Sequence, residues 1–112
     1  MTILDLEYGR PDVLTAERLL LGGLSRARST GERTVKLIHG YGSHGVGGAI
    51  RRHTRALLRE LEQTGRIASF LPGEDFGPFS EGGRAAIARD FSLTRDPDYG
   101  RANSGITLVF LR

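Results

Sequence analysis

A glycine-rich segment between two apolar stretches holds the residues best suited to chemistry. Residues 40–48 include five glycines, directly after His39, and residues 35–38 form a nearly continuous apolar run typical of a buried strand. Helical spacing of apolar residues begins at residue 49. Because glycine lacks a Cβ atom, backbone N–H groups stay open to a ligand, and a helix start favours an anion. The segment predicts a phosphate-binding turn, with a flexible connector as the alternative.

Arginines follow this turn along one side of the predicted helix. Residues 31–66 carry a net charge of +4, while the whole chain has only +3. A localised positive charge is the footprint of a phosphate-bearing partner, although a solvated helix face explains it equally well. Tyr41 could stack on a base or pack against the helix. The residues predicted to bind phosphate are Gly40, Tyr41, Gly42, Ser43, His44, Gly45, Gly47, Gly48, Arg51, Arg52 and Arg55.

Three known phosphate or nucleophile motifs are partly similar to this turn. Gly40, Gly42 and Gly45 have the G-x-G-x-x-G spacing of dinucleotide-binding turns. However, such a site needs an acidic residue closing the next strand, and proline and glycine follow residues 67–71 instead. The Gly-Lys-Ser/Thr ending of a Walker loop and the G-x-S-x-G of a nucleophile elbow are both missing. A small-molecule nucleotide or phosphate site at this turn remains the alternative function.

The elements that would position the turn alternate between strand and helix. Strands are predicted over residues 2–7, 35–38, 67–71 and 105–111. Helices are predicted up to residue 28 with Asp12 as the N-cap, from 49 to 64 and over 84–89. Strands linked through helices run parallel, whereas the last strand is free to run antiparallel. The order predicts an α/β fold, a two-layer βαβαβ(α)β sandwich with a mixed four-stranded sheet.

Length and composition are those of one small domain, residues 1–112. The absence of cysteine excludes disulfides, thiolate catalysis and cysteine-based zinc sites. Residues 1–9 contain two acids and no long apolar stretch, so we expect no signal peptide, no membrane contact and a cytoplasmic location. Residues 74–103 are irregular and are predicted to form an insertion, a lid or packing over a sheet edge. Phe76, Phe79 and Phe91 in that segment are predicted to be core anchors rather than a stacking platform.

Two short motifs resemble those of the Smr (small MutS-related) domain family. Residues 4–6, Leu-Asp-Leu, are similar to its LDxH motif, and residues 39–42, His-Gly-Tyr-Gly, are similar to its HGxG motif. The strand from residue 105 also looks like the closing strand of that family, so only residues 74–103 fall outside the resemblance. The resemblance implies a sandwich similar to the C-terminal domain of a translation initiation factor. It also implies binding to DNA or RNA, and endonuclease activity as in several members.

Glu7 stands where the LDxH motif has histidine. Asp5 and Glu7 are two residues apart on a strand, so both point to one face near the turn. Two carboxylates repel a phosphate unless a divalent cation lies between them. Hydrolysis at this site therefore predicts dependence on Mg²⁺ or Mn²⁺, with Asp5 and Glu7 as ligands and His39 near the scissile phosphate. A structural His39, bonded to a backbone carbonyl, is the alternative.

The sequence thus predicts a nucleic-acid-binding domain that selects structure rather than base sequence. Endonuclease activity is an open question because of Glu7. A protein-interaction module, with the basic helix against an acidic partner, is the further alternative. The sequence does not indicate an oligomeric state.

Overall fold

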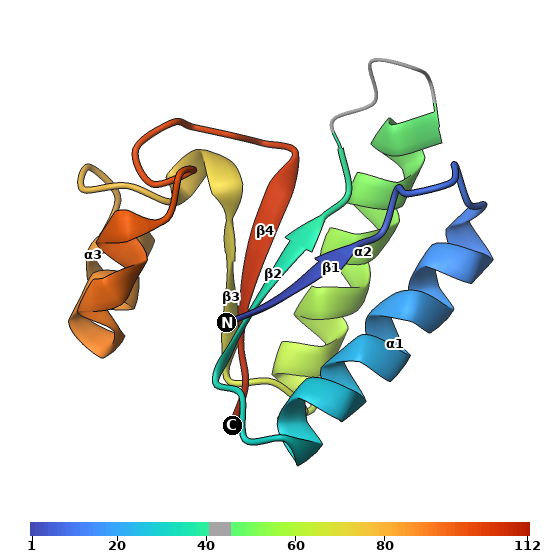
Figure 1. Ribbon diagram of the computed structural model, residues 1–112, viewed down its shortest axis with the longest axis horizontal. Helices are drawn as coiled ribbons and strands as arrows, with labels where there is room; N and C mark the ends of the chain where they lie inside the picture. Colours follow the sequence, from blue (N-terminus) through green and yellow to red (C-terminus); the bar gives the residue numbers. More distant parts are fainter. Residues whose placement is uncertain (41–45) are drawn as a thin grey trace.

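The structure, a computed structural model, describes residues 1–40 and 46–112 and contains a mixed sheet with strand order β1-β2-β4-β3 (Figure 1). The elements are β1 (Thr2–Asp5), α1 (Val13–Ser29), β2 (Thr34–Ile38), α2 (Val46–Gln63), β3 (Ser69–Pro72), the 3-10 helix η1 (Gly73–Asp75), α3 (Glu81–Arg89), the 3-10 helix η2 (Phe91–Arg95) and β4 (Ile106–Phe110). β1 and β2 are parallel, and β4 runs antiparallel to β2 and β3. The predicted α/β fold with a mixed four-stranded sheet is confirmed, and its last strand lies inside the sheet.

Local side chains explain where the helices begin. The Asp12 carboxylate accepts the N–H of Thr15 at 2.8 Å and caps α1, as the sequence predicts. Ser80 caps α3 in the same way through the N–H of Gly83. This cap starts α3 three residues before the predicted boundary. α2 also begins three residues early, at Val46, so that Gly47 and Gly48 belong to its first turn.

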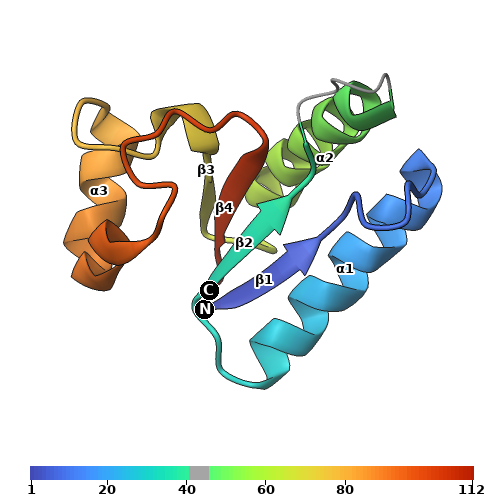
Figure 2. The same ribbon diagram turned by 45° about the horizontal axis from the view of Figure 1, so that its top comes forward.

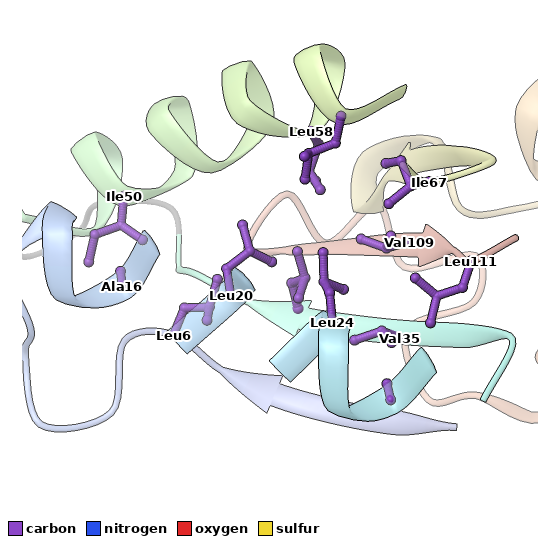
Figure 3. Packing of buried hydrophobic residues seen from close by; sticks show 13 residues of the cluster. Leu6, Ala16, Leu20, Leu24, Val35, Ile50, Leu58, Ile67, Val109 and Leu111 are labelled. Atoms are coloured by element: carbon purple, nitrogen blue, oxygen red, sulfur yellow. The ribbon is translucent and has the colours of Figure 1, made fainter. Parts of the chain in front are cut away.

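One face of the sheet is covered by α1 and α2, which lie side by side in both views (Figures 1 and 2). Apolar side chains from both helices and the sheet fill the layer between them (Figure 3). Leu20 of α1 and Leu58 of α2 are fully buried there, together with Val35 of β2 and Val109 of β4. This core fixes α2, and therefore its arginines, against the sheet.

The other face is covered in part by the segment of residues 74–103, which the sequence left irregular. Its η1, α3 and η2 lie over β3 and β4 (Figure 2), around a second apolar cluster that includes Phe76, Leu93 and Leu108. Phe76 is 1 % exposed and meets Tyr99 edge to face, so its prediction as a core anchor is confirmed.

The same prediction is wrong for the other two phenylalanines of that segment. Phe79 is 96 % exposed and Phe91 is 71 % exposed. The apolar space over β3 and β4 is already occupied by Phe76, Ala86 and Leu93, so neither ring has a place in it.

A buried ion cluster ties the same segment to the sheet. Nζ of Lys36 on β2 lies 2.9 Å from Oδ1 of Asp96 and also contacts the Asp98 carboxylate. Burial alone would lower the pKa of Lys36, but the hydrogen bonds to Asp98 and Asp96 outweigh it, and the pKa is raised. Asn103 donates to Asp98 and accepts the N–H of Gly105, so the cluster holds the connection that enters β4.

Within the described ranges, no helix is long and apolar enough to cross a membrane.

Candidate functional site

The ends of three strands meet at the edge of the sheet where α2 begins. β1, β2 and β3 all finish at this edge, and η1 and the first turn of α2 lie beside them (Figure 1). Tyr41, Gly42, Ser43, His44 and Gly45, which the sequence predicts to bind phosphate, lie outside the described residues. The geometry of the site is therefore that of the residues on either side of the turn.

His39 is 0 % exposed, and both of its ring nitrogens are hydrogen-bonded. Nδ1 lies 2.9 Å from the carbonyl oxygen of Gly40, which can only accept, so Nδ1 carries the proton. Nε2 is then the acceptor for the hydroxyl of Thr107, 2.8 Å away on β4. Burial, together with the positive charges of Arg55 and Arg51, lowers the pKa of His39 to about 4. The neutral imidazole matches the structural alternative considered from the sequence.

Arg55 of α2 extends this chain of hydrogen bonds. Its Nε donates to Oγ1 of Thr107 at 3.3 Å, and its two terminal nitrogens bind the Glu74 carboxylate of η1 at 2.9 and 2.7 Å. One of them also donates to the carbonyl oxygens of Ser104 and Ile106. Burial would raise the pKa of Glu74, but the Arg55 hydrogen bonds lower it. Arg55 therefore joins α2 to η1 and β4, and its charge is already paired with Glu74.

A hollow of about 440 Å³ opens beside this ion pair, lined by Arg51, Arg52, Arg55, Arg59 and Glu74. We refer to it as the arginine hollow. Among the described residues, no carboxylate forms an ion pair with Arg51, Arg52 or Arg59. Arg51 makes a long contact, 3.4 Å, with the hydroxyl of Ser104. The hollow is thus lined mainly by cationic groups.

Arg59 is a lining residue that the sequence-based site does not include. The sequence could have indicated Arg59, because it follows Arg55 by four residues and residues four apart lie on one face of a helix. The prediction extended only over the first turns of the helix, and the hollow reaches one turn further.

Asp5 and Glu7 lie where β1 meets the start of the glycine turn. Oδ1 of Asp5 accepts the N–H groups of Glu7 and Tyr8, both at 3.0 Å, and so turns the chain after β1. The Glu7 carboxylate packs against Gly40, where an added Cβ atom would come within 2.0 Å of Oε2. Gly40 also has a φ of +71°, so both its conformation and this contact require glycine. Glu7 therefore lies beside the residue that begins the glycine turn. The strand predicted over residues 2–7 ends at Asp5, so the placement of Asp5 and Glu7 on one strand is wrong.

A divalent metal ion has a limited set of donors here. The described part of the chain contains no cluster of three or more histidine, aspartate or glutamate residues that could hold a metal. Asp5 keeps one carboxylate oxygen free of the turn, and Glu7 offers two. Mg²⁺ commonly binds through one or two carboxylates and retains water, so this pair has suitable chemistry for it.

Comparison with known proteins identifies the class of this domain. The family model of the Smr domain matches residues 10–112, and the chain belongs to this family. The crystal structure of the Smr domain of MutS2 from Thermus thermophilus is similar, with a TM-score of 0.62 and 26% sequence identity. That similarity covers 100% of this chain and 99% of the other. A comparison with curated proteins gave no match. The family match begins after Glu7, so it does not include the strand that carries Asp5.

Proposed function

We propose that this Smr domain binds DNA or RNA at the edge of the sheet where α2 begins. The observation that carries the proposal is the arginine hollow, where Arg51, Arg52 and Arg59 converge. The carboxylate that lines it, Glu74, is already paired with Arg55. Planar guanidinium groups bind phosphate oxygens through paired hydrogen bonds, so the phosphodiester groups of a nucleic acid suit this hollow.

The start of α2 adds a second group of donors beside the hollow. The first N–H groups of a helix have no acceptor within the helix, and they carry the positive end of its dipole. Gly47 and Gly48 belong to this first turn, at the positions of these N–H groups. Such contacts hold the phosphate chain without reading bases, so binding depends on the shape of the nucleic acid.

The buried residues behind this surface position it. Neutral His39 holds the carbonyl of Gly40, and Thr107 and Arg55 hold His39 from the other side. In this proposal, His39 positions the start of the glycine turn and does not itself contact the phosphate.

Hydrolysis of a phosphodiester is the second part of the proposal. Mg²⁺ or Mn²⁺, when bound, would polarise a phosphoryl oxygen and lower the pKa of a water molecule. Asp5 and Glu7 would supply its carboxylate ligands, next to Gly40. Their position at the same edge as the arginine hollow supports this assignment.

A salt titration tests the binding. Affinity for a labelled duplex should fall steeply with salt, with a log–log slope of about −0.9 per phosphate contacted. Arg52→Ala and Arg59→Ala should each weaken binding and make the slope shallower by about one contact. Arg28→Ala is the matched control, because Arg28 is an exposed arginine in the last turn of α1.

Two results would contradict the proposal. Equal slopes for Arg52→Ala, Arg59→Ala and Arg28→Ala would place binding elsewhere on the domain. Saturable binding of a mononucleotide with a shallow slope would favour the small-molecule phosphate site instead.

A further inference from the structure

Phe79 is the most exposed large apolar side chain among the described residues, at 96 %. It lies in the connection between η1 and α3, on the rim of a second hollow of about 280 Å³. We call this the aromatic hollow. Its lining residues are Glu74, Asp75, Phe76, Gly77, Pro78, Phe79, Ser80, Gly100 and Ala102.

The backbone that carries Phe79 is held on both sides. Ser80 caps α3 and donates its hydroxyl to the carbonyl of Asp75, while Arg84 donates to the carbonyl of Pro78 at 3.2 Å. The N–H of Gly100 donates to the carbonyl of Phe76 at 2.8 Å, which closes the opposite wall. Because the backbone is already fixed, a ligand that covers the ring has only the side chain to order.

The charged residues that line the aromatic hollow determine which chemical groups it can bind. Its lining includes two carboxylates, on Glu74 and Asp75, and no cationic side chain. A phosphate is therefore repelled. A flat, uncharged ring can lie against Phe79, and its N–H groups can donate to a carboxylate, which is the chemistry of a nucleobase.

Glu74 lines both hollows, so the aromatic hollow lies next to the arginine hollow. We propose that a strand whose phosphates lie in the arginine hollow places an unpaired base in the aromatic hollow, against the ring of Phe79. The inference rests on the proposed function and specifies its ligand, a nucleic acid with a single-stranded segment. Bases inside a duplex are stacked on their neighbours, and their faces cannot reach an aromatic ring.

A basic peptide is the other ligand that an aromatic ring and carboxylates could accept. A basic peptide fits less well, because the cationic groups of the neighbouring arginine hollow would repel it. The overall charge of +3 acts in the same direction. The position of the aromatic hollow next to the arginine hollow therefore favours the nucleobase.

The test compares Phe79→Ala, Phe79→Trp and Phe91→Ala in the full chain. Phe91 is the matched control, because it is also exposed but does not line the aromatic hollow. The probes are an unstructured oligonucleotide and a blunt duplex of the same sequence. Phe79→Ala should weaken binding of the single strand about tenfold, with the salt slope unchanged because no charge is removed. Phe79→Trp should retain binding, and Phe91→Ala should have no effect.

The outcomes separate this inference from the proposed function. If Arg52→Ala weakens binding but Phe79→Ala behaves like Phe91→Ala on the single strand, the base site is refuted and the phosphate surface stands. If Phe79→Ala weakens duplex binding equally, the ring does not distinguish unpaired bases, and the inference is again overturned. Binding of a lysine-rich peptide that Phe79→Ala abolishes would assign the aromatic hollow to a protein. If Arg52→Ala and Arg59→Ala leave all binding unchanged, the proposed function itself fails.

Discussion

The hydroxyl of Thr107 donates a hydrogen bond to Nε2 of His39 across 2.8 Å, within a fully buried contact between β4 and the end of β2. Through this bond, the residue before the glycine turn is coupled to the last strand of the sheet. Arg55 donates to the same hydroxyl oxygen and continues the chain to Glu74. The cationic surface and the start of the turn are thus parts of one hydrogen-bonded unit.

Thr107→Val should destabilise the domain by about 1–3 kcal/mol, because it leaves the buried Nε2 of His39 without a donor. The measurement is urea unfolding. A double-mutant cycle with His39→Ala isolates the contact, and its coupling energy should exceed about 0.5 kcal/mol. Thr107→Ser is the control, since it keeps the hydroxyl. Additive effects of Thr107→Val and His39→Ala would mean that the hydrogen bond contributes nothing.

Lowering the pH should lower the free energy of unfolding, over the pH range between the unfolded and folded pKa values of His39. The folded protein holds the pKa of His39 at about 4, whereas the unfolded chain has the ordinary value of 6.5. Between these values the unfolded state binds a proton that the folded state does not, so stability decreases as the pH falls from 6.5 to 4. The loss should reach about 2 kcal/mol by pH 5.

Urea unfolding at pH 7 and pH 5 measures this effect, with His39→Gln as the variant that cannot titrate. The pKa values of Glu74 and Asp98 are also lowered, but from ordinary values of 4.5 and 3.8, so they act at more acidic pH. An equal pH dependence in the wild type and His39→Gln would show that another group is responsible.

Glu74→Gln should raise the affinity for an oligonucleotide a few-fold at low salt, since it removes the negative charge from the arginine hollow. The gain should disappear at high salt. Stability should change by about 1 kcal/mol or less, because the Glu74 carboxylate is partly solvent-exposed. Fluorescence anisotropy measures the affinity, and Glu62→Gln, on the exposed end of α2, is the control. A loss of affinity would show that Glu74 acts mainly by holding Arg55 in place.

Nicking of supercoiled plasmid or structured RNA should require Mg²⁺ or Mn²⁺ and stop when the metal is chelated. Glu7→Gln and Asp5→Asn should each reduce the rate by at least about tenfold, because each removes a ligand charge. Asp5→Asn keeps the oxygen that accepts the N–H groups after β1. Gel electrophoresis of the products measures the rate. Nicking that persists in both Glu7→Ala and His39→Ala would place the reaction outside this site.

The parts of the fold that depend on neighbouring residues were predictable from the sequence. The order of strands and helices follows from apolar periodicity, and the start of α1 follows from Asp12. One relationship between distant residues was also predictable: Glu7 lies near Gly40 because β1 and β2 are parallel and end at one edge. In contrast, α2 begins within the glycines, because packing against the sheet outweighs their low helix propensity.

Partners far apart in the chain were not predictable. Arg55 meets Glu74 nineteen residues away, and Lys36 meets Asp96 across sixty residues. No local pattern marks such pairs, so the prediction treated Arg55 as free to bind phosphate. The direction of a side chain in an irregular segment is equally hidden, as the exposed ring of Phe79 shows.

The central position of β4 has a consequence for how the domain comes into being during synthesis. β2 and β3 do not pair with one another: β2 pairs with β1 on one side and with residues 106–110 on the other, and β3 pairs with residues 106–110. A nascent chain that stops short of these residues has two unpaired strand edges and an apolar layer without one of its walls. We expect the domain to acquire its protease resistance in a single late step, after β4 leaves the ribosome.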